Sequence, residues 1–138
     1  MRVPRGETAD TASMPWMLLR IVLSFALGLL AMAPAVAADQ LVMFEQAGCP
    51  YCAAWNRDVG GIYAKTDEAH VLPLRRVDIH AERPADLRTV GEIHFTPTFV
   101  VMHCGRETAR LVGYSGQDNF WGLLDHDIAD LKGSPCRI

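Results

Sequence analysis

Two cysteines three residues apart, Cys49 and Cys52, lie where an apolar run gives way to a helical pattern. The run over residues 41–44 is typical of a buried strand. Pro50 suits the first turn of a helix, because that position needs no backbone N–H donor. Cys49 is therefore expected at the amino end of a helix, where free N–H groups and the helix dipole favour a thiolate. Since Cys52 shares its helical face, the spacing predicts thiol–disulfide exchange in which Cys49 attacks and Cys52 resolves.

Two other uses of a Cys-x-x-Cys pair are alternatives. Zinc ribbons and copper carriers have the same spacing, but a zinc site needs a second pair of ligands, and Cys104 and Cys136 lack the required spacing. A permanent staple between Cys49 and Cys52 would close too small a loop to add much stability. The redox interpretation is favoured over both, and we expect neither a metal nor a cofactor at this site.

Strand and helix patterns follow in the order strand, helix, strand, helix, strand, strand, helix. They cover residues 41–44, 50–69, 72–79, 84–91, 97–102, 108–112 and 118–131. Gly60-Gly61 is expected to break or bend the first helix, and Ser115-x-x-Asp118 to start the last as a variant capping box. The first two strands should lie parallel through a right-handed crossover, and the last two should form a hairpin. These features predict an α/β fold with a four-stranded mixed sheet covered by helices on both faces.

The amino terminus has the pattern of an export signal. Residues 21–33 are apolar, Pro34 ends the run, and residues 35–37 supply the small-x-small pattern that a signal peptidase needs. The run is short for a membrane span, which favours a cleaved signal. The alternative is an uncleaved anchor, and this segment would then be the protein's only contact with the membrane. We predict a signal peptide over residues 1–38, one domain over residues 39–138, and a periplasmic location.

Charge and histidine content exclude some partners. After residue 38 the chain has ten Lys and Arg against fourteen Asp and Glu, a net charge of −4. Nucleic acid is not expected as a partner, because no basic stripe is available to neutralise phosphates. The histidines show no metal-ligand spacing and are expected on the surface or in loops: His70, His80, His94, His103 and His126.

Cys104 and Cys136 are candidates for a structural disulfide. The third predicted strand and the last helix both start at the edge of the sheet that carries Cys49, so both end at the far edge. A bond there would close a loop of about 30 residues and add ~3 kcal/mol in the entropy model. Two free thiols, or a second redox relay, are the alternatives.

A second motif, Thr96-Pro97-Thr98, precedes an apolar strand, and with it the sequence resembles the thioredoxin superfamily over residues 41–131. The resemblance rests on residues 44–52, 77–79, 95–101 and 112–114. It implies that the peptide bond before Pro97 is cis and that Pro97 faces the cysteine pair. It also implies that the backbone at Thr96 pairs with an extended substrate segment. Pro50 and Tyr51 are the other expected substrate-binding residues. Without the resemblance, Pro97 is an ordinary proline at a strand start.

More closely, the sequence is similar to small periplasmic thioredoxins of bacterial sulfur-oxidation (Sox) gene clusters. This similarity rests on residues 61–66, 73–79, 96–100, 113–114 and 120–124. It implies a reductase for one or a few exported cysteine-containing proteins, such as the carrier protein of a thiosulfate-oxidising system. A membrane electron-transfer protein would then act as reductant.

Several residues depart from the superfamily pattern. Pro50-Tyr51 is the glutaredoxin dipeptide, and Met43 occupies the position where thioredoxins place a buried aspartate. Proton transfer to Cys52 would then need water or another group, with Glu45 a remote candidate. Tyr51 and Trp55 are expected to form an apolar rim for a partner.

The direction of exchange stays open at this point. A disulfide oxidant or isomerase would use the same cysteines, since direction depends on the redox potential and the electron donor. There are two non-enzymatic alternatives. One is a copper or zinc carrier that uses Cys49, Cys52 and a histidine, and the other is a redox-responsive interaction module without turnover.

Overall fold

The computed structural model describes residues 37–136. The predicted signal segment lies almost wholly outside these residues. The elements, in chain order, are β1 (Gln40–Glu45), α2 (Pro50–Trp55), the π-helical turn η1 (Asn56–Gly60), α3 (Gly61–Tyr63), α4 (Asp67–Val71), β2 (Leu74–Asp78), the 3-10 turn η2 (Ala85–Leu87), β3 (Thr98–His103), β4 (Arg106–Val112) and α5 (Gln117–Lys132). Within residues 37–136, no helix has the length and apolar content to cross a membrane.

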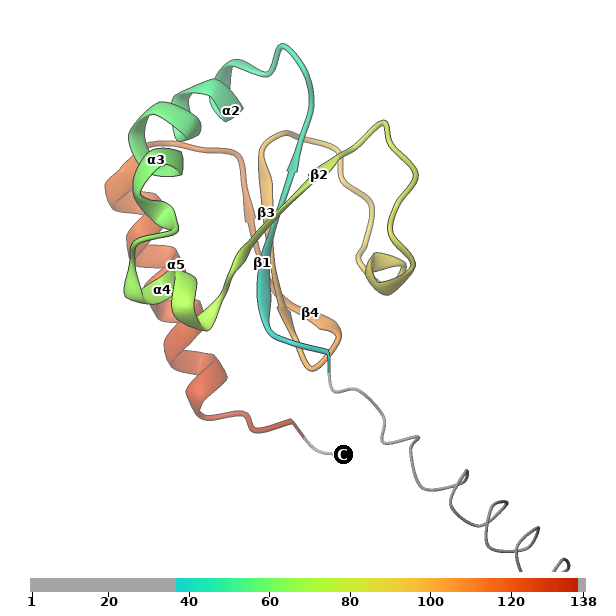
Figure 1. Cartoon of the computed structure of the whole chain (residues 1–138), viewed down its shortest axis with the longest axis vertical. Coiled ribbons are helices and arrows are strands. Elements are labelled where there is room, and N and C mark those ends of the chain that lie inside the picture. The colour runs from blue at the N-terminus through green and yellow to red at the C-terminus, as the bar shows by residue number, and fades with distance from the viewer. Residues whose placement is uncertain (1–36, 137–138) are drawn as a thin grey trace, which may run out of the picture. The chain divides into compact units, whose positions relative to one another are not determined.

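The four strands form one mixed sheet in the order β2-β1-β3-β4 (Figure 1). β1 and β2 are parallel, with Leu41 opposite Leu74. β3 is antiparallel to β1 and to β4, with Phe44 opposite Thr98. The predicted parallel pair and the terminal hairpin are both confirmed, and so is the α/β class with a four-stranded mixed sheet flanked by helices.

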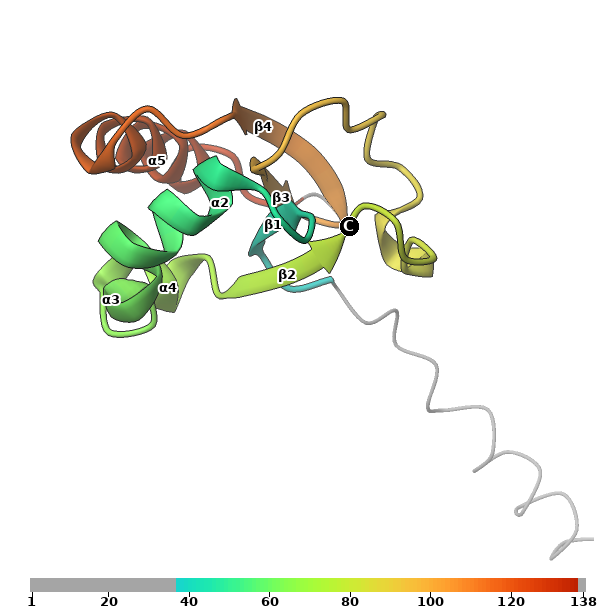
Figure 2. The same ribbon diagram turned by 90° about the horizontal axis from the view of Figure 1, so that it is seen from above.

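The α-helices α2, α3, α4 and α5 lie together on one face of the sheet (Figure 2). The core on this face is built around Trp55, whose ring centroid lies 5.3 Å from that of Phe99 and 5.7 Å from that of Phe120. Both Cys49 and Cys52 belong to this buried cluster. The larger core therefore lies directly beneath the cysteine pair.

Helices were expected on both faces, but the opposite face is covered by the connection between β2 and β3 (Figure 2). A helix was expected over residues 84–91, but the structure has only the 3-10 turn Ala85–Leu87 there. Leu87 and Val90 are the buried residues of this segment, packed against Val42, Phe44 and Val100. Leu87 ends the 3-10 turn, and Val90 follows in a further turn, in which its N–H donates to the Leu87 carbonyl at 3.1 Å.

The chain stays helical from Pro50 to Tyr63 and is not broken at Gly60-Gly61. The expected bend takes the form of the π-helical turn Asn56–Gly60. A Cβ atom at Gly60 would lie 3.2 Å from the Trp55 ring, so this glycine permits close contact between the turn and the core.

The last helix does not start with the predicted capping box. Its N-cap is Gly116, whose φ of 116° lies in the region that favours glycine, and no side chain caps the helix. Ser115 instead accepts a hydrogen bond from the Asn119 amide, at 2.9 Å from Oγ to Nδ2. Asp118 lies in the first turn, where a negative charge complements the helix dipole.

Candidate active site

Cys49 is the N-cap of the helix that begins at Pro50, with an extended backbone (φ −73°, ψ 112°). Its Sγ accepts a hydrogen bond from the Cys52 backbone N–H at 3.1 Å. The two cysteines form a disulfide with Cα atoms 5.3 Å apart. A donor aimed at Sγ stabilises negative charge on this sulfur once the disulfide is reduced.

The segment before β3 lies against the cysteine pair. The Thr96–Pro97 peptide bond is cis, the isomer that the resemblance implied. The Thr96 carbonyl oxygen lies 3.3 Å from Cys49 Sγ. Because a disulfide sulfur carries no proton, this is a close contact in the oxidised protein that becomes a possible hydrogen bond in the dithiol. Pro97 is buried, and its carbonyl accepts from the Gly113 N–H at 2.7 Å.

The two cysteines differ in their surroundings. Cys49 is 7% exposed and lies next to the exposed residues Pro50 and Tyr51, whereas Cys52 is 4% exposed and faces the core. Both sulfurs therefore lie at the edge of the core, with Cys49 at the surface end of the helix.

An apolar groove lies beside Cys49. It is lined by Tyr51, Phe95, Thr96, Val112, Gly113, Tyr114 and Ser115. Three of its apolar side chains are well exposed: Tyr51 at 62%, Phe95 at 68% and Val112 at 59%. Sequence reasoning identified Tyr51 and Thr96 but missed Phe95 and Val112, because an apolar residue within a strand or just before one is usually buried. Trp55 was wrongly expected at this rim; it is 0% exposed, as the largest side chain of the core.

A hydrogen bond joins the groove to the helix that carries the cysteines. The Tyr114 hydroxyl donates to Asp58 Oδ2 at 3.0 Å. Burial and the neighbouring Asp58 carboxylate raise the pKa of Tyr114 to about 12, so the hydroxyl stays neutral and keeps donating. This bond fixes one wall of the groove relative to the helix.

Methionine takes the place of the missing aspartate near Cys52. Met43 is fully buried in the same cluster as Cys52. Glu45 is bound by Arg76, whose Nε lies 2.6 Å from Oε1. Arg76 also donates to Asn56 and lies over the Trp55 ring. Because Glu45 is held in this ion pair, it is poorly suited to carry the proton of Cys52.

The other two cysteines are joined by a second disulfide. Cys104 and Cys136 have Cα atoms 5.5 Å apart, within the range that a disulfide requires. The bond joins the end of β3 to the segment after α5, the pairing that the geometric argument favoured.

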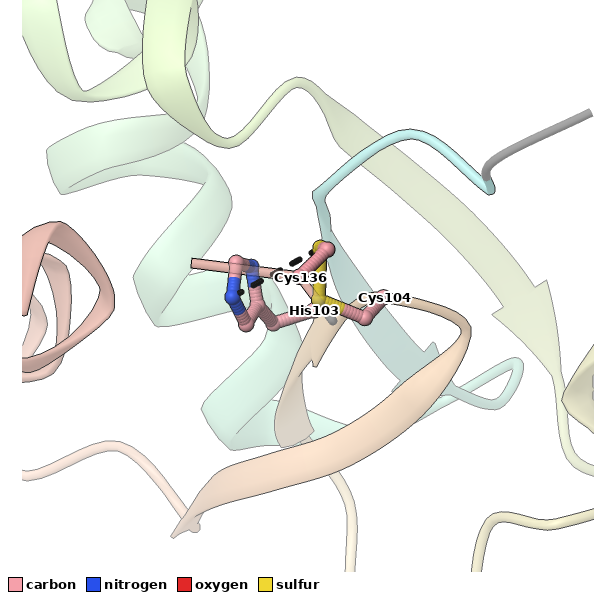
Figure 3. A group of neighbouring side chains, drawn as sticks. All are labelled: His103, Cys104 and Cys136. Atoms are coloured by element: carbon pink, nitrogen blue, oxygen red, sulfur yellow. Dashed lines mark hydrogen bonds between the residues drawn. A yellow bond between two sulfur atoms is a disulfide. The ribbon is translucent and has the colours of Figure 1, made fainter. Parts of the chain in front are cut away.

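One histidine lies closer to these cysteines than the sequence spacing indicated. One ring nitrogen of His103 and the sulfur atoms of Cys104 and Cys136 all lie within 4.8 Å of one another (Figure 3). The chain shows no metal-ligand spacing of the histidines, but folding brings His103 next to this cysteine pair. Sequence spacing missed this group because Cys136 is 33 residues from His103 along the chain. The two sulfurs are bonded to each other, which leaves them poor metal ligands in this state.

Comparison with known proteins agrees with the site. The family model described as a thioredoxin-like domain matches residues 30–127. A search of curated protein sequences found no match.

Several solved structures are similar to this chain. The periplasmic thioredoxin SoxS from Paracoccus pantotrophus, in its reduced form, is 41% identical, with a TM-score of 0.63 over 66% of this chain and 96% of that one. A thioredoxin from Thermus thermophilus is 22% identical, with a TM-score of 0.56 over 80% of this chain and 82% of that one. A thioredoxin from Malassezia sympodialis is 20% identical, with a TM-score of 0.51 over 67% of this chain and 80% of that one. The last two resemblances concern the fold alone.

Proposed function

Because this chain belongs to the thioredoxin-like family and is a thiol–disulfide oxidoreductase, we propose that it works in the periplasm as a reductase of one or a few exported proteins. The observation that carries the proposal is the position of Cys49, with its Sγ at the N-cap of a helix and 3.3 Å from the Thr96 carbonyl. The periplasmic location follows the 41% identical periplasmic thioredoxin and the export signal predicted over residues 1–38.

The reaction starts from the reduced pair. The Cys49 thiolate attacks one sulfur of a disulfide on the partner, forming a mixed disulfide and releasing the partner's other sulfur as a thiolate. Cys52 then loses its proton and attacks Cys49 Sγ. This step forms the Cys49–Cys52 disulfide and releases the partner's second sulfur, so two electrons pass from the pair to the partner. The partner leaves as a dithiol.

The Cys49 thiolate is stabilised by the helix start. The Cys52 N–H donates to Sγ at 3.1 Å, and Pro50 opens the helix without an N–H that would need another acceptor. Charge-assisted bonds of this kind are shorter and stronger than neutral ones. Among residues 37–136, no comparable donor reaches the Cys52 sulfur, so Cys52 serves as the resolving thiol.

The partner binds along the groove beside Cys49. An extended segment pairs with the backbone at Thr96, while Tyr51, Phe95 and Val112 contact its apolar side chains. Main-chain pairing of this kind gives affinity, and alternate side chains give specificity. Pro50, Tyr51, Thr96 and Pro97 are thus the proposed substrate-binding residues.

The proposed partner is an exported cysteine-containing protein, with the carrier protein of a thiosulfate-oxidising system as the first candidate. This choice rests on the similarity to Sox thioredoxins, of which the 41% identical structure is one example. A membrane electron-transfer protein would return Cys49 and Cys52 to the dithiol form after each cycle.

Trapping tests the roles of the two cysteines. A Cys52→Ala variant, incubated with extracts of exported proteins, is expected to hold a partner as a mixed disulfide through Cys49, identifiable by mass. The matched Cys49→Ala variant should hold none, because the attacking sulfur is gone. Two results would contradict the proposal. One is that Cys49→Ala captures a partner and Cys52→Ala does not. The other is that Cys49→Ala and the wild type turn over a protein disulfide equally well.

The redox potential tests the direction. Equilibration of the Cys49–Cys52 pair with glutathione is expected to give a potential in the range of reducing thioredoxins, near about −270 mV. A value above about −150 mV would instead assign the protein to the oxidants, since strong oxidants lie in that range.

A further inference from the structure

The second disulfide has a histidine beside one of its sulfurs. His103 Nε2 lies 3.8 Å from Cys136 Sγ, within hydrogen-bond range for sulfur (Figure 3). His103 is the last residue of β3, Cys104 follows it, and Cys136 lies in the segment after α5. This corner is at the opposite end of β3 from Pro97, about 20 Å away along six extended residue steps.

The contacts of His103 require a proton on both ring nitrogens. Nδ1 lies 2.8 Å from Asp39 Oδ1, and Nε2 lies 2.6 Å from the Ser134 carbonyl oxygen. A carboxylate and a carbonyl can only accept, so each ring nitrogen must donate. The imidazolium form satisfies both contacts, and the neutral ring satisfies one. In agreement, the Ser134 carbonyl and then Asp39 raise the pKa of His103 above its ordinary value.

The positive charge lies next to Cys136. Asp39 contacts the other ring nitrogen, Nδ1, so its negative charge lies on the side of the ring away from Nε2. In disulfide exchange, the sulfur that best bears negative charge is the better leaving group. His103 therefore favours departure of Cys136 over departure of Cys104.

We propose that the Cys104–Cys136 disulfide is a second thiol–disulfide exchange site, at which a small thiol attacks Cys104 Sγ and Cys136 leaves beside His103. The attacking thiolate forms a bond to Cys104 Sγ, and the bond between the two cysteines breaks. Cys136 departs with the electron pair as a thiolate. A second thiol that attacks the mixed disulfide regenerates the Cys104 thiol and leaves as a disulfide with the first, so two small thiols supply both electrons.

Both sulfurs are accessible enough for this reaction. Cys104 and Cys136 are half-buried, whereas Cys49 and Cys52 are buried. Cys104 lies at the tip of the hairpin between β3 and β4, with a positive φ of 52°, and is followed by Gly105. A small thiol can therefore reach the hairpin tip without unfolding of the sheet.

The test uses the full chain with Cys49→Ser and Cys52→Ser, which leaves Cys104–Cys136 as its one disulfide. The protein is incubated with reduced glutathione, quenched in acid and alkylated with N-ethylmaleimide. Peptide mass mapping is then expected to find glutathione on Cys104 and maleimide on Cys136. Adding His103→Asn should slow the opening about tenfold and spread glutathione over both cysteines. His94→Asn is the matched control and should react like the parent, since His94 is exposed and, within residues 37–136, is paired with Glu92 alone.

Three outcomes would overturn the proposal. They are glutathione found mainly on Cys136, equal opening rates for the parent and His103→Asn, and a disulfide that opens only in denaturant. If His103→Asn does not fold, as judged by circular dichroism, Asp39→Asn takes its place. That variant keeps the ring but removes the carboxylate that holds its proton, so it should also react more slowly than the parent. An unchanged rate for Asp39→Asn would likewise overturn the proposal.

Discussion

Cys49 Sγ lies 3.3 Å from the Thr96 carbonyl oxygen, although 47 residues separate the two in the chain. The sheet register produces this contact. Phe44 pairs with Thr98 across β1 and β3, so the chain leaving β1 and the chain entering β3 meet at the same edge of the sheet. The helix start and the proline segment are thus held together by the central strand pair.

The groove beside Cys49 predicts selective loss of activity with a protein substrate. Phe95→Ser removes an apolar side chain that is 68% exposed, so it should leave the free energy of unfolding nearly unchanged. It should lower kcat/KM about tenfold with a protein disulfide, because the lost apolar contact is worth about 1.5 kcal/mol. Activity with a small disulfide should stay the same. Ile62→Ser is the matched control: Ile62 is 49% exposed but is not a groove residue, and a similar loss there would contradict the assignment.

Two tyrosine hydroxyls predict different effects on stability. Tyr63 is buried and donates to the Leu72 carbonyl at 2.8 Å, whereas Tyr114 donates to Asp58 at an exposed site. Tyr63→Phe should lower the free energy of unfolding by about 1–3 kcal/mol, because it leaves a buried carbonyl without a donor. Tyr114→Phe should lower it by less than about 0.5 kcal/mol. Urea denaturation of both variants measures the difference, and equal losses would count against the buried bond.

The Cys104–Cys136 bond predicts a large contribution to stability in the oxidised protein. It joins residues 32 apart, for which the chain-entropy model gives about 3–4 kcal/mol. The double variant Cys104→Ser, Cys136→Ser should lose this amount in urea denaturation under oxidising conditions. The same variant carrying an intact Cys49–Cys52 pair should keep its activity with a protein disulfide. A loss below about 1 kcal/mol would show that the bond does not constrain the unfolded chain as the model requires.

His103 predicts a pH dependence of stability with a definite sign. Its pKa is raised in the folded protein, first by the Ser134 carbonyl and then by Asp39. A raised folded pKa adds stability below the unfolded value, near about 6.5, and this stability is lost as the pH rises through the folded pKa. The difference in unfolding free energy between the wild type and His103→Asn should therefore be larger at pH 5.5 than at pH 8.5. A difference that grows with pH would contradict this assignment.

The sequence was sufficient for the parts of the fold that local patterns determine. The strand character of residues 41–44 and the position of Pro50 placed Cys49 at a helix start, and the structure agrees. The pairing of Cys104 with Cys136 followed from the directions of β3 and α5. The cis bond before Pro97 came from the resemblance, because local spacing allows either isomer.

Other features depend on tertiary contacts that periodicity does not encode. Trp55 follows Cys52 by only three residues, which suggested a place at the rim of the site. Its ring is instead buried against Phe99 and Phe120. Residues 84–91 have the proline and glycine of a helix, but only two of their apolar side chains pack against the sheet. Leu87 does so at the end of the 3-10 turn, and Val90 does so three residues later. The contact of His103 with Cys136 requires the whole of α5 to fold back along the sheet.

The most direct test of the central claim is the alkylation rate of each cysteine in the reduced protein. After reduction of both disulfides, iodoacetamide is added at pH 6 and the products are mapped by mass over time. Cys49 should react at least tenfold faster than Cys52, because the helix start stabilises the thiolate of the first cysteine alone. Faster reaction of Cys52, or equal slow reaction of both, would show that Cys49 is not the attacking sulfur.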